Sequence, residues 1–345
     1  MDPNIKISLA DCPSQVDPAL QKEYRGKVGS LQWLALLTRP DLAYSVSILS
    51  RFLHAPGIKH LEAANRVLRY LKGTQLLGIT YVSNVSLLSP IMPDLNRLFG
   101  FSDASFASCL DTGKSTSGYV LWLNGGPVVW CSKRQPTVML ATAAAETYTI
   151  SRAAVMIVVA RQILFCFRCP QPGPTPLYAD NKAAITISEG KSVMTETQKH
   201  VTVQAKYVSE CVQRGLIILI YVPTTSNRAD FLTKPLGGQA FRSHRDVVMA
   251  YNSRPQADLE ALMISTCCSE SGSVVLSRLL EFYRLTRCEF YSIQWTILVV
   301  KLVPGIQHEE SFWTDRLNKL RRRLRSLRTR LVGKSTGRMF ADHSA

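Results

Sequence analysis

Residues 98–131 constrain the fold most, because three β-rich segments follow one another there. Leu98–Phe106 alternates apolar and polar side chains, and this alternation indicates a half-buried strand. Ser117–Leu123 and Pro127–Cys131 are also β-rich, and they flank Asn124-Gly125-Gly126. An Asn-Gly pair between two such segments is typical of a tight hairpin. The sequence therefore predicts three consecutive antiparallel strands.

Helices and strands then alternate along the chain. Apolar residues at helical spacing predict a long helix over residues 142–167, followed by a short strand at 177–179. The next expected elements are a helix over 197–214, a strand at 217–222 and a last helix opening at 228–233. We expect the order βββ-α-β-α-α-β-α, with two helical segments between the fourth and fifth strands, and this order favours an α/β fold with helices packed on a mixed sheet.

We divide the chain into three parts. Residues 1–95 form a small helical region, residues 96–240 the α/β domain, and residues 241–345 a helical, partly disordered C-terminal extension with no assigned role. In the first part, helical periodicity is followed by stop signals at Pro40 and Pro56-Gly57. The helices expected there cover residues 24–37, 42–53 and 60–71.

The basic charge is concentrated near the C-terminus. The formal net charge is +16, and ten basic residues and no acid fall between Arg316 and Arg338. Leucines at alternating spacings of three and four predict a basic amphipathic helix over 316–338. Such a helix could bind nucleic acid, an anionic membrane or the nuclear import machinery. It could also be adventitious translated sequence without a function. The surplus that suggests a polyanionic partner thus lies mostly outside the α/β domain.

The cysteines and the apolar runs indicate an intracellular protein, cytoplasmic or nuclear and not secreted. Nine cysteines at irregular spacing, with no signal peptide, do not suggest a disulfide framework. Cys166-x-x-Cys169 lacks the two further ligands that structural zinc requires. Apolar stretches such as 153–167 and 293–303 fall short of the ~18–20 residues that span a bilayer, so we expect no membrane span.

Four acids stand where carboxylates are costly. Asp103 lies inside an apolar strand, and Glu146 precedes Ile150 by one helical turn on the inward face of the long helix. Asp180 ends the fourth strand, and Asp230 opens the last helix. A buried carboxylate needs a partner, and convergent carboxylates suit hard divalent cations. Scattered acids are more often solvated, so composition alone leaves both interpretations open.

Several ordered motifs resemble a known family. They include Gly100-Phe-Ser-Asp-Ala-Ser-Phe106, Asp111-Thr-Gly-Lys-Ser-Thr-Ser-Gly-Tyr-Val120, Leu140-Ala-Thr-Ala-Ala-Ala-Glu146, Tyr178-Ala-Asp-Asn181 and Ala229-Asp-Phe-Leu-Thr-Lys-Pro-Leu236. The chain resembles the ribonuclease H domain of Ty1/Copia-type retrotransposon polyproteins through these motifs. Upstream, Thr38-Arg-Pro-Asp-Leu-Ala-Tyr44 and Arg66-Val-Leu-Arg-Tyr-Leu-Lys-Gly73 resemble the stretch between the polymerase and ribonuclease H domains. The likeness covers about residues 1–250.

The resemblance implies a ribonuclease-H-like mixed five-stranded sheet with flanking helices. It also implies hydrolysis of the RNA strand of an RNA–DNA hybrid with two Mg²⁺ ions, or Mn²⁺ in their place. The family's metal-binding acids fall on Asp103, Glu146, Asp180 and Asp230. One ion would activate the attacking water and the other would stabilise the departing 3′ oxygen.

Other positions are candidates for contact with the nucleic acid. Five residues that border the first strands could contact its backbone: Lys114, Ser115, Thr116, Lys133 and Arg134. They also fit the simpler interpretation of exposed hairpin residues. His200 is a candidate for an auxiliary role in product release or proton transfer, with a structural histidine as the alternative.

Departures from the family pattern leave two functions open. The run before Glu146 is Ala143-Ala-Ala, and Thr202 stands where the family has an acid. No Tyr-x-Asp-Asp pair occurs, so no polymerase activity is expected, and residues 1–95 would be a remnant of the reverse-transcriptase thumb or connection. The sequence thus predicts either a ribonuclease H from a truncated Copia-like element or a catalytically inactive nucleic-acid-binding remnant. Reverse transcriptase and other element-encoded domains are the expected protein partners.

Overall fold

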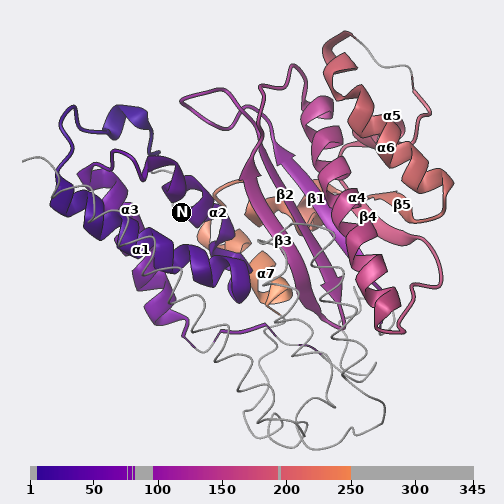
Figure 1. The fold of residues 1–345 in the computed structure, drawn as a ribbon, viewed down its shortest axis with the longest axis horizontal. Coiled ribbons are helices and arrows are strands. Elements are labelled where there is room, and N and C mark those ends of the chain that lie inside the picture. The colour runs from indigo at the N-terminus through magenta and orange to yellow at the C-terminus, as the bar shows by residue number, and fades with distance from the viewer. Residues whose placement is uncertain (1–5, 76, 80, 82–95, 193–195, 250–345) are drawn as a thin grey trace, which may run out of the picture. The chain divides into compact units, whose positions relative to one another are not determined.

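A five-stranded mixed sheet is the centre of the structure (Figure 1). The computed structural model describes residues 6–75, 77–79, 81, 96–192 and 196–249, and all of them belong to one compact unit. The strand order is β3-β2-β1-β4-β5. β1 (Phe99–Ser105), β2 (Thr116–Leu123) and β3 (Gly126–Arg134) are antiparallel neighbours, whereas β4 (Thr175–Ala179) and β5 (Ile217–Tyr221) run parallel to β1. The expected fold class is confirmed.

The predicted hairpin joins β2 to β3 through two residues, Asn124 and Gly125. Both have positive φ, 50° and 84°, which a two-residue hairpin turn of type I′ requires at its two central residues. Asparagine and glycine are the residues that adopt this conformation at low cost, so the local sequence determines the turn.

The long helix α4 (Thr142–Cys166) lies against the sheet, and α5 (Lys182–Ser188) and α6 (Thr202–Gln213) pack beside it. Among the described helices, α4 has the length and apolar composition that a membrane crossing requires. It also contacts β1, β2 and β4 and buries polar side chains such as Glu146 and Thr149. This is the arrangement of a core helix, and its apolar character follows from contact on several sides.

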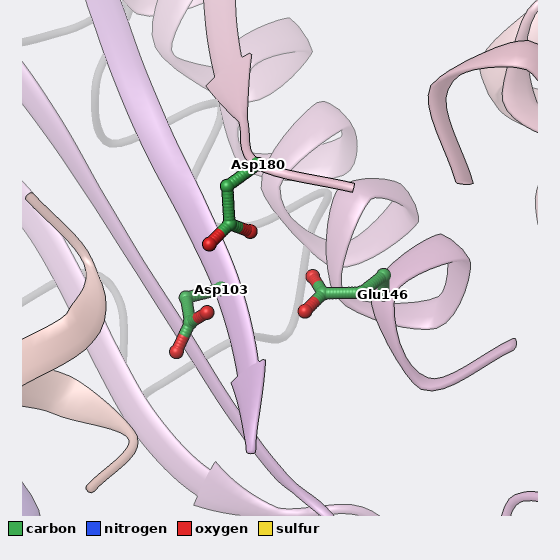
Figure 2. A group of neighbouring side chains, drawn as sticks. All are labelled: Asp103, Glu146 and Asp180. Carbon is green, nitrogen blue, oxygen red and sulfur yellow. The ribbon is translucent and has the colours of Figure 1, made fainter. Parts of the chain in front are cut away.

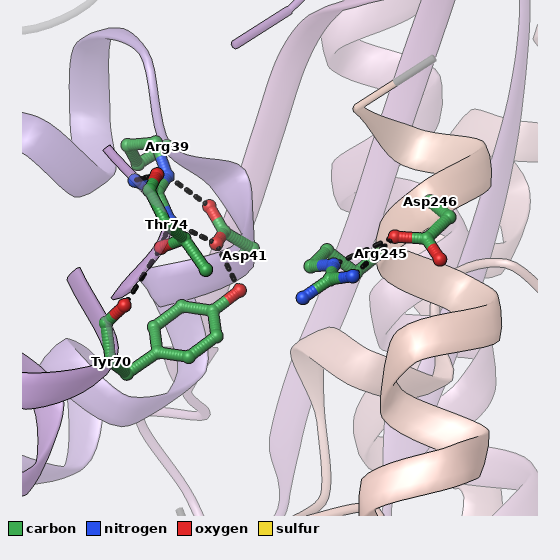
Figure 3. A network of polar contacts seen from close by, with 6 residues as sticks. All are labelled: Arg39, Asp41, Tyr70, Thr74, Arg245 and Asp246. Atoms are coloured by element: carbon green, nitrogen blue, oxygen red, sulfur yellow. Dashed lines mark hydrogen bonds and ion pairs between the residues drawn. The ribbon is translucent and has the colours of Figure 1, made fainter. Parts of the chain in front are cut away.

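The helical region has a core of its own. α1 (Pro18–Leu37), α2 (Ala43–Leu49) and α3 (Ile58–Gly73) pack around buried Tyr24, Leu31 and Leu49. The Arg39–Asp41 ion pair, 2.7 Å long, is buried at the turn between α1 and α2, where Tyr70 donates to Asp41 over 2.7 Å and Arg39 also donates to Thr74 (Figure 3). These bonds satisfy two buried charges at once, which keeps the cost of burying them low.

Trp130 of β3 connects the helical region to the sheet. Its indole Nε1 donates to the carbonyl oxygen of Ala35 over 2.7 Å. Ala35 lies in the last turn of α1, where carbonyl groups have no partner within the helix. The tryptophan therefore satisfies a buried helix end from another part of the fold.

We expect the substitution Trp130→Phe to lower the free energy of unfolding by about 1–3 kcal/mol, because it leaves the Ala35 carbonyl buried without a donor. Urea unfolding of the full chain measures this loss. Trp33→Phe is the matched control, since Trp33 is 61 % exposed on α1. Equal effects of the two substitutions would contradict the role of the Trp130 bond.

The last helix differs from its prediction. Residues 228–233 do not open a continuous helix: Asp230–Leu232 form a single 3-10 turn, and the helix α7 covers Gly238–Val248. The interruption has a simple cause, because Pro235 lacks an N–H and disfavours helical backbone at Lys234. The C-terminal extension from residue 250, with the predicted basic helix at 316–338 and the apolar stretch at 293–303, lies outside the described residues.

Candidate active site

The register of two parallel strands brings Asp103 and Asp180 together. β1 and β4 run parallel with Phe101 opposite Tyr178. Two residues further along the chain in each case come Asp103, within β1, and Asp180, directly after β4. Parallel strands end at the same edge of a sheet. Two acids that are 77 positions apart in the sequence therefore lie next to each other.

Glu146 reaches the same edge from α4. It lies in the second turn of the helix, one turn before Ile150, and both side chains are buried, as the helical spacing predicted. Its Oε1 accepts a hydrogen bond from the backbone N–H of Ala104 over 3.1 Å. The bond ties the helix to the strand next to Asp103.

The three carboxylates converge on one space (Figure 2). One ligand oxygen each from Asp103, Glu146 and Asp180 lies within 4.8 Å of the other two. Asp103 and Glu146 are buried, and Asp180 is half-buried. Such a set of oxygen donors fits a hard divalent cation.

Asp230 lies beside this triad. Its Oδ1 is 2.9 Å from Nζ of Lys234, and its charge contributes to raising the pKa of Asp103. Asp230 is not part of the group whose ligand atoms lie within 4.8 Å of one another; in the described residues that group consists of Asp103, Glu146 and Asp180. The structure thus brings three of the four predicted acids together and places the fourth next to them, paired with a lysine.

Burial and mutual repulsion dominate the electrostatics of the acids. Burial raises the pKa of Asp103 to about 7, with a further contribution from Asp230 and opposition from Lys234 and Thr233. Burial and the charges of Asp103 and Asp180 raise the pKa of Glu146 well above its ordinary value. Burial also raises the pKa of Asp230, against the hydrogen bond and charge of Lys234. Carboxylates held in this way favour a positive charge among them.

The hydrogen bonds leave oxygens free for such a charge. Thr233 donates its hydroxyl to Oδ2 of Asp103, and Ala104 donates to Oε1 of Glu146. Oε2 of Glu146 is buried with no hydrogen-bond partner among the described residues. A buried carboxylate oxygen without a donor is costly, and a divalent cation would remove that cost. The residues present therefore fit a metal.

Sequence reasoning missed three residues that shape this site: Asn227, Thr233 and Lys234. Asn227 is fully buried, donates to the carbonyl oxygen of Ser102 over 3.0 Å and accepts from the N–H of Ala229 over 3.1 Å. Thr233 and Lys234 lie within the motif around Asp230, which was the available signal. The roles of Asn227 and Thr233 depend on contacts with β1, more than 100 positions away, which the local pattern does not reveal.

The five candidates for nucleic acid contact occupy different environments. Ser115 and Thr116 are buried, and their hydroxyls bond to the N–H of Ala107 and to Ser108. The ammonium group of Lys114 donates to the carbonyl oxygen of Pro136, and Arg134 donates to the sulfur of Cys109 over 3.4 Å. Lys133 is exposed on β3. The exposed lysine is thus the best placed of the five to meet a ligand.

His200 is not part of the group of acids that brings its ligand atoms together. Its side chain is exposed, and Nε2 lies 3.0 Å from the sulfur of Met139, in the loop between β3 and α4. In the described part of the chain, the polar contact of the His200 ring is this one with Met139. The auxiliary role of His200 stays a prediction.

Several proteins with similar sequences are retrotransposon polyproteins. The chain is 35 % identical over 243 residues to the retrovirus-related Pol polyprotein from transposon RE1 of Arabidopsis thaliana, which is 70 % of this chain and 16 % of that polyprotein. It is 30 % identical over 248 residues to the polyprotein from transposon TNT 1-94 of Nicotiana tabacum, covering 71 % and 18 % of the two chains. The chain thus spans less than a fifth of the length of these relatives. No family model matches it.

A shorter protein is also similar to this chain in sequence, and a solved structure is similar to it in fold. The secreted RxLR effector protein 161 of Plasmopara viticola is 40 % identical over 130 residues, covering 38 % of this chain and 85 % of that protein. LC11-RNase H1, solved in complex with an RNA/DNA hybrid, covers 40 % of this chain and 94 % of its own, with 13 % identity and a TM-score of 0.31.

Proposed function

Because this chain is a relative of the Copia-type retrotransposon Pol polyproteins, we propose that residues 96–240 act as a ribonuclease H. The reaction is hydrolysis of the RNA strand of an RNA–DNA hybrid within the strand. The observation that carries the proposal is the convergence of Asp103, Glu146 and Asp180 at one edge of the sheet. Charge repulsion makes such a cluster unfavourable for stability, so a role in binding cations explains it better than packing does.

Asp103, Glu146 and Asp180 would hold divalent cations, with Asp230 as the fourth ligand. Two Mg²⁺ ions, or Mn²⁺, would supply a hydroxide near neutral pH and stabilise charge on the leaving oxygen. The protein's own part is to fix the ligands. Thr233 holds one oxygen of Asp103, the N–H of Ala104 holds one oxygen of Glu146, and Asn227 fastens the segment that carries Asp230 to β1.

The proposed substrate, an RNA–DNA hybrid, follows from the sequence motifs and from the chemical difference between an RNA strand and a DNA strand. Metal-assisted hydrolysis by itself does not distinguish RNA from DNA, and the 2′-hydroxyl group is the feature that a protein can read. The exposed Lys133 lies in β3, the second strand of the β2–β3 hairpin, and would contact the phosphate backbone.

A second candidate function is a catalytically inactive nucleic-acid-binding remnant of the same element. The observation that favours it is the loss of acids that flank the matched motifs, at Ala143-Ala-Ala145 and at Thr202. Such a protein would bind the hybrid without cleaving it, so binding alone does not separate the two functions.

The deciding experiment is cleavage of an end-labelled RNA annealed to DNA, using the full chain with Mg²⁺. We expect cleavage within the RNA strand, none of the same RNA alone or in an RNA duplex, and a rate at least about 10²-fold lower for Asp103→Asn. Asp246→Asn, a change on α7 outside the triad, should cleave as the unmodified protein does. Equal cleavage by the unmodified protein and Asp103→Asn, or none by either, would contradict the proposed enzyme. Binding without cleavage would support the inactive remnant.

A further inference from the structure

The segment 227–234 packs on β1 and β2 beside the acids and is held there at several points. Asn227 bonds to the backbone of Ser102, and Thr233 donates to the carboxylate of Asp103. Gly118 of β2 permits this close approach, because a Cβ atom there would lie 2.6 Å from Cγ2 of Thr233 and 2.8 Å from Cβ of Leu232. The backbone that carries Lys234 is therefore fixed in place from both neighbouring strands.

The position of Lys234 is further restricted by its neighbours in sequence. Its N–H donates to the carbonyl oxygen of Asp230 over 3.2 Å, and Pro235 follows it. The ammonium group lies 2.9 Å from Oδ1 of Asp230, whose side chain is 9 % exposed, while that of Lys234 is 35 % exposed. The carboxylate of this ion pair is buried and its ammonium group is partly exposed, whereas the lysine of the Lys191–Glu189 pair is 70 % exposed.

The charge of Lys234 reaches beyond Asp230. It lowers the pKa of Asp103 and of Glu146 against the larger effect of burial. Burial lowers the pKa of Lys234 itself, but Asp103, Asp230 and Asp180 together outweigh burial and raise it. The charge of one ammonium group therefore acts on all four acids of the candidate site, and the group itself lies against Asp230.

We propose that Lys234 is the internal counter-ion of the acidic site, which neutralises part of its charge in the metal-free chain and competes with divalent cations for Asp230. This inference rests on the metal site of the proposed function. It explains why Asp230 stands beside the triad: the lysine binds the carboxylate that would otherwise complete the ligand set. It makes Lys234 a positioning residue, which sets metal affinity through Asp230 and the local charge.

The test compares Mn²⁺ affinity, measured by calorimetry on the full chain, and the thermal unfolding midpoint of the metal-free chain. The variants are Lys234→Met, which keeps the apolar stem, and Lys234→Arg, which keeps the charge. Lys191→Met is the control for loss of an exposed lysine. We expect Lys234→Met to bind Mn²⁺ about tenfold more tightly, because the competing cation is gone. Its metal-free midpoint should fall by about 3 °C or more, since four acids lose their counter-ion. Lys234→Arg and Lys191→Met should resemble the unmodified chain.

Unchanged or weaker Mn²⁺ binding by Lys234→Met, while the unmodified chain binds, would overturn the inference and leave the proposed metal site intact. Binding by neither protein would instead count against the metal site itself. In that case the metal-free midpoint decides: a midpoint of Lys234→Met equal to that of the unmodified chain would overturn the counter-ion role. A Lys234→Arg chain that departs from the unmodified chain as far as Lys234→Met does would also overturn it, because the charge would then not be the property that matters.

Discussion

Replacing Glu146 with glutamine is expected to slow metal-dependent cleavage strongly and yet to stabilise the metal-free chain. Glu146 is buried, its Oε2 has no hydrogen-bond partner among the described residues, and it faces the charges of Asp103 and Asp180. Glutamine has the same shape, still accepts from the N–H of Ala104, and carries no charge. Its amide group can also donate to a neighbouring carboxylate. The substitution therefore removes a metal ligand and a source of repulsion together.

The two effects have different sizes and separate measurements. We expect the cleavage rate of a labelled hybrid to fall by about 10²–10³-fold. In EDTA at about pH 8, the free energy of unfolding in urea should rise by about 1–3 kcal/mol. Glu210→Gln is the control, because Glu210 is exposed on α6 and pairs with Arg214. A Glu146→Gln protein that cleaves normally, or that is less stable without metal, would contradict our account of the site.

The sequence predicted the sheet well because local patterns determine most of it. Alternation in Leu98–Phe106 and the Asn124-Gly125 turn depend on neighbouring residues, and β1, β2 and β3 form where these signals lie. The long helix α4 has the predicted start at Thr142. The prediction of a last helix that opens at residues 228–233 was wrong, although Pro235 and Gly237-Gly238 are local signals that interrupt a helix.

The candidate site was predictable only in part, for a physical reason. A carboxylate within an apolar pattern is visible in one sequence, and this is how Asp103 and Glu146 stand out. That Asp180 joins them depends on the parallel register of β1 with β4, which forms between distant segments. The hydrogen bond from Thr233 to Asp103 and the ion pair of Lys234 likewise depend on where the 3-10 turn packs on the sheet. Residue type indicates the chemistry, and tertiary packing decides which groups meet.

The same buried carboxylates predict how stability depends on pH. The folded chain holds a proton on Asp103 up to a pKa of about 7, whereas the ordinary value for an unfolded chain is 3.8. Between these values the folded state binds more protons than the unfolded state, so the free energy of unfolding falls as the pH rises. The contribution of Asp103 is therefore fully present below about pH 4 and is lost by about pH 7. His244, whose burial lowers its pKa to about 4, acts in the opposite direction, because its folded form stays neutral while the unfolded chain binds a proton.

The difference in unfolding free energy between Asp103→Asn and the unmodified chain separates the effect of Asp103 from that of His244, because His244 is present in both proteins. Asparagine keeps an acceptor for Thr233 and does not titrate, so the variant should gain stability relative to the unmodified chain as the pH rises from about 4 to about 7. The gain should approach about 3–4 kcal/mol and stay level above about pH 7. Urea unfolding of both proteins in EDTA across this range measures it, and a difference that does not change with pH would contradict it. Adding Mg²⁺ at about pH 7 should stabilise the unmodified chain and leave the variant nearly unchanged, because the charge that opposes folding in the metal-free site is the charge that holds the cation.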